Sequence, residues 1–166
     1  MMKYSVISNS TPLIAFVKKN ELPVLKSLFN EIMIPKAVFD EIINLPHRFD
    51  NEGEIFNKEI RKKWIIVKEI STPNFTKLNL GKGEIEALNL CFEVDNPLLL
   101  MDEKKGRNIA KSFEIIVLGT LGILALAKKR NLKNEQNLLE NLDLLIKRGF
   151  YLSSDIILRF LKELKG

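Results

Sequence analysis

The chain has 166 residues, 46% of them hydrophobic, and this length supports one well-buried core but is short for two. Its single cysteine excludes an internal disulfide, and no apolar run is long enough to cross a bilayer. The formal net charge of +5 favours a polyanionic partner such as nucleic acid, and lysines that only solubilise the surface are the alternative explanation. We therefore expect one cytoplasmic domain, residues 1–166, that does not contact a membrane.

Five short apolar segments, rich in Ile, Val and Leu, alternate along the chain with helix-length intervals. Such segments predict buried strands, and their alternation with helices is typical of a mostly parallel sheet covered on both faces. We therefore expect an α/β fold with strands at residues 3–8, 31–34, 64–69, 97–101 and 115–118. The expected helix starts are marked by Pro12 after Ser10 and Thr11, by Pro35 in a first turn, by Gly83 and by Thr120 as a cap.

Two segments depart from this alternation. Residues 45–63 are polar and are interrupted by Pro46 and Gly53, which predicts an extra helix or helix pair that protrudes from the sheet edge. Residues 71–83 predict a loop that leads into the next helix.

The tail, residues 134–166, predicts two amphipathic helices, the second capped by Ser153 or Ser154. The first carries an apolar stripe formed by Leu138, Leu142 and Leu145. This stripe serves either as a dimer interface or as the face that packs on the chain's own sheet.

Acidic residues lie at several of the predicted element ends. Glu41 borders the apolar face of its helix whereas Asp40 points nearly opposite, so Glu41 is the better candidate for a site. Glu84 shares a face with apolar residues of its helix, whereas Glu86 falls on the polar face. Asp102 directly follows an apolar run. Helix-dipole complementation or capping explains the same acids without a site, and capping does not exclude metal binding.

Carboxylates that are dispersed in sequence but meet in space bind hard divalent cations, because Mg²⁺ and Mn²⁺ prefer oxygen ligands and also bind substrate phosphates. With the positive net charge, the acids indicate a phosphodiester hydrolase that requires Mg²⁺ or Mn²⁺. His47 has no second His or Cys nearby, which argues against a zinc site, and no serine or cysteine has a partnered base. Cys91 and Trp64 are expected in the core.

Several motifs in this order and spacing resemble the PIN-domain proteins, in particular a prokaryotic branch with an S(N/D)TSPLI-like opening: VISNSTPLIAFV, IMIPKAVFDEII, GKGEIEALNL, LLLMDEKKGRNIAK and IIVLGTLGILALAKK. The likeness spans most of residues 6–150 and is weakest over 45–63. It implies a single Rossmann-like α/β/α domain with acids at the carboxyl edge of a parallel sheet. It also implies endoribonuclease activity, and many members are toxins of the virulence-associated protein C type that pair with an antitoxin.

Carried over by position, the four metal ligands of the family fall on Asn9, Glu41, Glu84 and Asp102, of which the three acids are the catalytic candidates. Asn9 is the departure, because an asparagine carbonyl coordinates a hard cation without contributing negative charge. Asparagine occurs at this position in the branch that the chain resembles. The alternatives are a catalytically silent member and an Asn9 that only stabilises the strand-to-helix turn.

Other polar groups are candidates for the surroundings of the site. Ser10 and Thr120 stand at strand-to-helix transitions, where they orient metal-bound water or cap the helices. Glu86 is a further candidate near the acids. Lys104, Lys105 and Arg107 follow Asp102 closely and either grip phosphate or form a solvated helix face.

The sequence thus favours a metal-dependent endoribonuclease, with RNA, an antitoxin protein and a second copy of the chain as expected partners. A phosphoacceptor receiver domain is less favoured, because residues 8–10 supply no acid after the first strand. A dinucleotide-binding fold is less favoured because GKGEIE lacks the GxGxxG pattern. A catalytically silent interaction module remains the main alternative.

Overall fold

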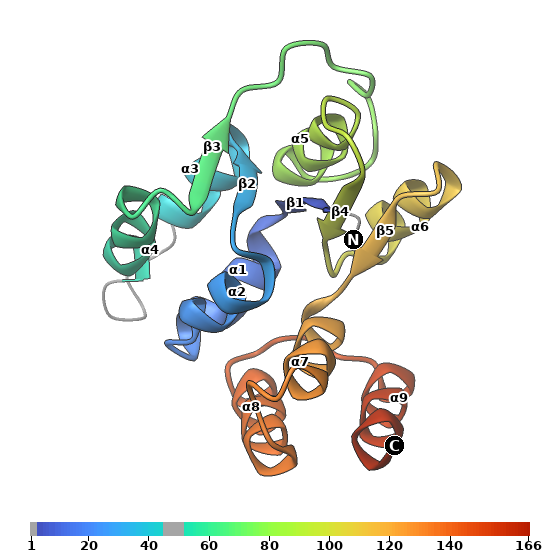
Figure 1. Cartoon of the computed structure of the whole chain (residues 1–166). Coiled ribbons are helices and arrows are strands. Elements are labelled where there is room, and N and C mark those ends of the chain that lie inside the picture. Colours follow the sequence, from blue (N-terminus) through green and yellow to red (C-terminus); the bar gives the residue numbers. More distant parts are fainter. Residues whose placement is uncertain (1–2, 45–51) are drawn as a thin grey trace.

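The computed structural model describes residues 3–44 and 52–166, and within them five strands form one sheet (Figure 1). The strand order is β3-β2-β1-β4-β5, and every neighbouring pair is parallel. The strands are β1 (Ser5–Ser8), β2 (Ile32–Pro35), β3 (Ile65–Lys68), β4 (Pro97–Leu100) and β5 (Ile116–Leu118). Each overlaps the segment expected from the sequence, so the predicted parallel α/β fold is confirmed.

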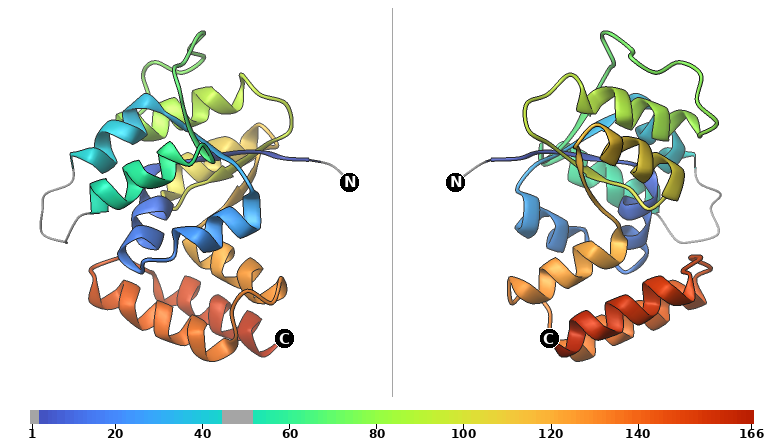
Figure 2. Two further views of the ribbon diagram at one scale, coloured as in Figure 1. Left: turned by 60° about the vertical axis from the view of Figure 1, so that its left-hand side comes forward. Right: turned by 90° about the vertical axis from the view of Figure 1, so that its right-hand side faces the viewer.

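Helices cover both faces of the sheet (Figures 1 and 2). They are α1 (Ser10–Lys18), α2 (Leu22–Phe29), α3 (Lys36–Ile43), α4 (Glu52–Arg61), α5 (Lys82–Cys91), α6 (Lys104–Ser112), α7 (Thr120–Lys129), α8 (Glu135–Lys147) and α9 (Ser154–Lys165). In all views α8 and α9 lie at the end of the molecule opposite α5. In the described part of the chain, no helix is both long and apolar enough to cross a membrane.

Two hydrophobic cores lie on opposite faces of the sheet. Val6 and Ile7 are neighbours in β1, yet Val6 belongs to the larger core with α1 to α4 and α7 to α9, whereas Ile7 belongs to the smaller core with α5 and α6. This division follows from strand geometry, because successive side chains point to opposite faces. Trp64 and Cys91 are each 3% exposed, which confirms both as core residues. Burial raises the pKa of the Cys91 thiol to about 12.

The helix α4 does not protrude from the sheet, which corrects the prediction for residues 52–63. Phe56 is fully buried in the larger core. Glu59 is 7% exposed and accepts hydrogen bonds from Trp64 Nε1 and Lys62 Nζ, each at 2.7 Å. Although most residues of α4 are charged or polar, one face of the helix is apolar, and this face packs against the larger core. The predicted break at Pro46, and His47, lie outside the described residues.

Three helix starts differ from the prediction. The N-cap of α7 is Gly119; Thr120 is the first helical residue, and its hydroxyl donates to Asp102. Pro35 ends β2 and is the N-cap of α3, so it precedes the first turn. Gly83 lies inside α5, whose N-cap is Gly81.

The carboxyl-terminal helices form as predicted, with Ser153 capping α9 through the amide of Ile156. The side chains of the α8 stripe are buried in the larger core of the same chain: Leu138, Leu142 and Leu145. Of the two roles expected for the stripe, the structure shows packing within the chain. The stripe is therefore not an exposed dimer surface.

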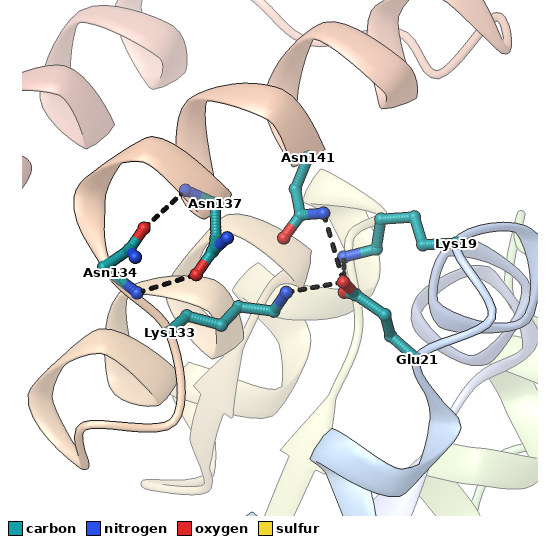
Figure 3. Close-up of polar contacts among 6 residues, drawn as sticks. All are labelled: Lys19, Glu21, Lys133, Asn134, Asn137 and Asn141. Carbon is teal, nitrogen blue, oxygen red and sulfur yellow. Dashed lines mark hydrogen bonds and ion pairs between the residues drawn. The ribbon is translucent and has the colours of Figure 1, made fainter.

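A buried polar cluster joins this helical pair to the start of the chain (Figure 3). The Glu21 carboxylate lies 2.6 Å from Lys133 Nζ and 3.3 Å from Lys19 Nζ, and Asn141 donates to it at 3.4 Å. The Lys19 side chain is 1% exposed, and its ammonium lies 4.0 Å from the centroid of the Phe16 ring. Burial lowers the pKa of Lys19 from 10.5 to about 8, although Glu21 opposes this shift.

We expect Lys19→Met to remove a pH-dependent part of the folding stability. The folded chain releases the Lys19 proton near pH 8, whereas the unfolded chain keeps it until about pH 10.5, so the unfolded state binds more protons between these values. The free energy of unfolding of the wild type should therefore rise relative to Lys19→Met from pH 8 to pH 10, by roughly 2 to 3 kcal/mol.

Urea unfolding at pH 7, 8, 9 and 10 measures this difference. Lys162→Met, at an exposed position of α9, is the matched control and should follow the wild-type curve. Parallel curves for the wild type and Lys19→Met would contradict a buried, titrating ammonium.

Candidate active site

The polar residues expected from the sequence lie along one edge of the sheet. All five strands are parallel, so their carboxyl ends meet at this edge, where Asn9 follows β1 and Gly119 follows β5. The strand order reverses between β1 and β4, and the Asn9 amide donates to Leu100 O at 3.0 Å across this boundary. In open α/β sheets, ligands bind in the crevice at such a switch point.

Asn9 is the N-cap of α1 and is 2% exposed. Its side-chain oxygen accepts a hydrogen bond from the amide of Ser10 and lies 3.1 Å from the Ser10 hydroxyl oxygen. The strand-to-helix turn is thus stabilised by Asn9, as one of the sequence interpretations expected. Capping uses the same oxygen that a cation would use, so a ligand role for Asn9 stays a prediction.

Ser10 also connects Asn9 to Glu41 of α3. The Ser10 hydroxyl lies 2.7 Å from Glu41 Oε2, and the Gly83 amide of α5 donates to Glu41 Oε1 at 3.0 Å. Glu41 is itself an exposed residue, so its carboxylate is fixed from two helices and still accessible.

Asp102, two residues after β4, is fixed by Thr120. The Thr120 amide donates to Oδ1 at 2.7 Å, and the Thr120 hydroxyl donates to Oδ2 at 2.6 Å. Burial raises the pKa of Asp102, while the bonds from Thr120 and the charge of Arg107 act in the opposite direction. Thr120 therefore orients the Asp102 carboxylate in addition to starting α7, whereas a role for Thr120 in orienting metal-bound water stays a prediction.

The two acids of α5 have separate structural roles. Glu84 accepts a hydrogen bond from the Gly81 amide at 2.7 Å and so closes a capping box on its own helix. Glu86 accepts from the Ala37 amide at 2.9 Å, at the start of α3. Glu86 lies on the polar face of α5, but this face is not open to solvent: Asn89 is 2% exposed and forms hydrogen bonds with Asn74 and Phe75 of the preceding loop.

The basic residues after Asp102 are placed differently from one another. Lys104 and Lys105 are exposed on α6, and Lys105 Nζ lies 3.4 Å from Asn79 O. Arg107 is partly buried and lies close enough to Asp102 to influence its pKa. Of the three cations, Arg107 is thus the one that belongs to the site.

The donor chemistry fits a hard cation. Asn9 and Asp102 follow the strands at the switch point, and Glu41 is linked to Asn9 through Ser10; all three offer side-chain oxygen atoms, which suit Mg²⁺ or Mn²⁺. In residues 3–44 and 52–166, however, no group of three or more His, Cys, Asp or Glu side chains is placed to hold a metal ion. The arrangement therefore fits a cation that keeps several waters and binds through one or two carboxylates together with substrate phosphate.

Gly83 and Gly119 are site residues that sequence reasoning did not identify. A Cβ atom on Gly83 would lie 2.5 Å from Glu41 Oε1, and a Cβ atom on Gly119 would lie 2.9 Å from Asp102 Oδ1. Each glycine thus makes room for a carboxylate at the start of a helix. The sequence offered one signal, a glycine at the start of each of these two helices. Glycines are too common at helix starts to indicate a site.

Known proteins resemble this chain in sequence and in fold. A family model described as PIN domain matches residues 5–166. No curated protein matches the chain. Among solved structures, the chain is similar to a PilT N-terminus domain protein from the hyperthermophilic archaeon Sulfolobus solfataricus P2. The identity is 24%, the match covers 75% of this chain and 92% of that chain, and the TM-score is 0.53, which supports the fold alone.

We expect Gly83→Ala to disturb Glu41 without unfolding the chain. The new methyl group would displace the Glu41 carboxylate, whereas alanine inside a helix gains about 1 kcal/mol in propensity over glycine. Thermal unfolding with millimolar Mn²⁺ measures the effect, because an ion that binds the folded state raises the melting temperature. Gly83→Ala should lose most of the increase that Mn²⁺ gives the wild type.

The matched control is Gly122→Ala in α7, where a Cβ atom would make only an ordinary contact, 3.4 Å from the Leu118 side chain. It should retain the full increase. A Gly83→Ala variant that responds to Mn²⁺ like the wild type would show that the position of Glu41 does not matter for the ion.

Proposed function

Because the chain belongs to the PIN-domain family, whose members are generally nucleases, we propose that it is a metal-dependent endoribonuclease that hydrolyses RNA phosphodiester bonds. The observation that carries the proposal is the pair of carboxylates at the switch point, each fixed by one hydroxyl and one helix amide. The positive net charge of +5 supports a nucleic-acid substrate.

Glu41 and Asp102 would hold Mg²⁺ or Mn²⁺, with Asn9 as a neutral ligand and Glu84 as the fourth member of the proposed set. When bound, such an ion binds the phosphate and lowers the pKa of a water molecule. The residues of the chain prepare the site for this chemistry. Ser10 and Gly83 orient Glu41, and Thr120 orients Asp102, so the carboxylates need not reorganise when substrate arrives.

Several finer proposals follow from the same family. We propose that the nuclease acts in the cytoplasm as the toxin of a toxin–antitoxin pair, and that it forms a homodimer. The interface would lie outside the buried stripe of α8, because those leucines are used within the chain. Capture of the native complex identifies an antitoxin, and light scattering measures the stoichiometry.

The second candidate function is a catalytically silent module that binds RNA or protein. Two observations favour it: Asn9 contributes no charge, and no group of three acids is placed for a metal in the described residues. Both candidates require the same fold, so only measurements of activity separate them.

RNA cleavage is the direct test of the proposal. The wild type should cut single-stranded or structured RNA in Mg²⁺ or Mn²⁺ and should stop when a chelator is added. Glu41→Gln and Asp102→Asn should each lower the rate by more than roughly 100-fold, since loss of even an outer-shell partner costs about 10- to 100-fold. RNA binding should persist, because it would rest on surface cations and weaken with salt.

Asp40→Asn is the matched control for Glu41→Gln. Asp40 is the preceding residue in α3 and pairs with Lys36 at 3.1 Å, away from the Ser10 and Gly83 contacts. It should cut at the wild-type rate. Cleavage that survives both Glu41→Gln and Asp102→Asn would disprove the assigned site.

Asn9→Asp distinguishes the active enzyme from the silent module. Aspartate adds one negative charge at the switch point, so Mn²⁺ should bind more tightly and cleavage should accelerate. The Asn9 cap is preserved, because aspartate caps helices as well as asparagine does. Isothermal titration measures the affinity. Equal affinities would show that residue 9 is not a ligand, and cleavage by Asn9→Asp alone would make the natural chain a silenced nuclease.

A further inference from the structure

The guanidinium of Arg107 lies beside Asp102 without being paired to it. A Cβ atom on Gly119 would lie 2.5 Å from Arg107 Nη1 and 2.9 Å from Asp102 Oδ1, so both groups lie over the same backbone position. Among the residues that the structure describes, the guanidinium forms none of the ion pairs or side-chain hydrogen bonds found for other residues. A partly buried cation of this kind retains its donors for an anion.

Asp102 is oriented by Thr120 and forms no ion pair with Arg107. Its two carboxylate oxygens accept hydrogen bonds from Thr120, at 2.7 and 2.6 Å. These bonds hold the carboxylate toward the amino end of α7. Arg107 lies near enough for its charge to oppose the rise in the pKa of Asp102 that burial causes, and the N–H groups of its guanidinium remain available as hydrogen-bond donors.

The position of α6 brings Arg107 to this place. Gly106, the residue before Arg107, is buried, and a Cβ atom there would collide with Met101 Sδ. The first turn of α6 therefore packs directly against the residue that precedes Asp102. This close approach positions Arg107 at the same edge of the sheet as the carboxylates.

Space accounts for the glycine at position 119. Gly119 has φ −87° and ψ 175°, an extended conformation that any residue adopts, so backbone freedom is not required. Ser, Asn and Asp are better N-caps than glycine, so capping does not require it either. A side chain at position 119 would displace the Arg107 guanidinium and the Asp102 carboxylate, so glycine leaves room for both groups.

We propose that Arg107 binds a non-bridging phosphate oxygen of the RNA substrate, and that Gly119 keeps open the space from which it does so. The proposal rests on the proposed function, because it assigns the phosphate contact of that same site. Arg107 is then a substrate-binding residue, and Gly119 is a positioning residue that acts through Arg107. Glu41 of α3, Asp102 of the loop after β4 and Arg107 of α6 would then contact the phosphodiester together.

A double-mutant cycle tests the proposal, using the wild type, Arg107→Ala, Gly119→Ala and the double variant. The dissociation constant of a fluorescent single-stranded oligoribonucleotide is measured in the presence of a chelator, which should stop cleavage, at several salt concentrations. Arg107→Ala should weaken binding by roughly tenfold or more and reduce the salt slope by about one. Gly119→Ala should do the same, and the double variant should lose little beyond either single variant.

Two further variants serve as references. Gly122→Ala introduces the same methyl group in the same helix without a collision and should bind RNA like the wild type. Arg107→Lys keeps the positive charge but lacks the planar guanidinium, so it should retain only part of the RNA affinity. Melting curves establish that each variant is folded, and the two Arg107 variants test the contact even if Gly119→Ala unfolds.

The outcomes separate this proposal from the nuclease assignment. Wild-type affinity in Arg107→Ala would overturn the phosphate contact while leaving cleavage untouched. Equal losses from Gly119→Ala with and without Arg107 would overturn the role of Gly119, because its methyl group would then act through Asp102. Binding that depends on Arg107 in a chain that never cuts RNA would support the contact and reject the nuclease. A wild type that neither binds nor cuts RNA would overturn both.

Discussion

The parallel direction of all five strands is the constraint on which the rest of the structure depends. Parallel strands end at one edge, and each crossover helix then begins there, so the free amides of several helix starts collect at the same edge. These amides need acceptors. Asn9 at α1, Glu41 at α5 and Asp102 at α7 supply them, so the polar groups of the site also complete the hydrogen bonding of the fold.

This double role explains how the acids are held in one place. An ionised carboxylate is stabilised at a helix amino end, and each of the two central acids also accepts a hydroxyl bond. Gly83 and Gly119 make the close approach possible, since a Cβ atom at either position would reach a carboxylate oxygen at under 3.0 Å. Asn9 caps its helix without adding charge, which distinguishes this site from one with an acid after every strand.

The carboxyl-terminal helices are attached by different forces from those at the site. Buried leucines of α8 join the larger core, and the Glu21 cluster adds two lysines and an asparagine at the same junction. Lys19 is desolvated there and remains beside one carboxylate, which makes this attachment sensitive to pH. The Glu21 cluster lies at the carboxyl end of α1 and the start of α2, whereas Asn9 caps the amino end of α1. The junction and the candidate site are therefore attached to the same helix.

The sequence by itself determined the sheet, because continuous apolar segments such as Leu98–Leu100 must be buried on both faces. It also determined that Asn9 and Asp102 follow strands and that Glu41 lies within the helix after the second strand. Local patterns could not assign Glu84 and Glu86, since whether an acid caps its own helix or a neighbour depends on which helices meet. The burial of α4 and the need for glycine at positions 83 and 119 likewise depend on distances between segments far apart in the chain, and only the tertiary structure decides those distances.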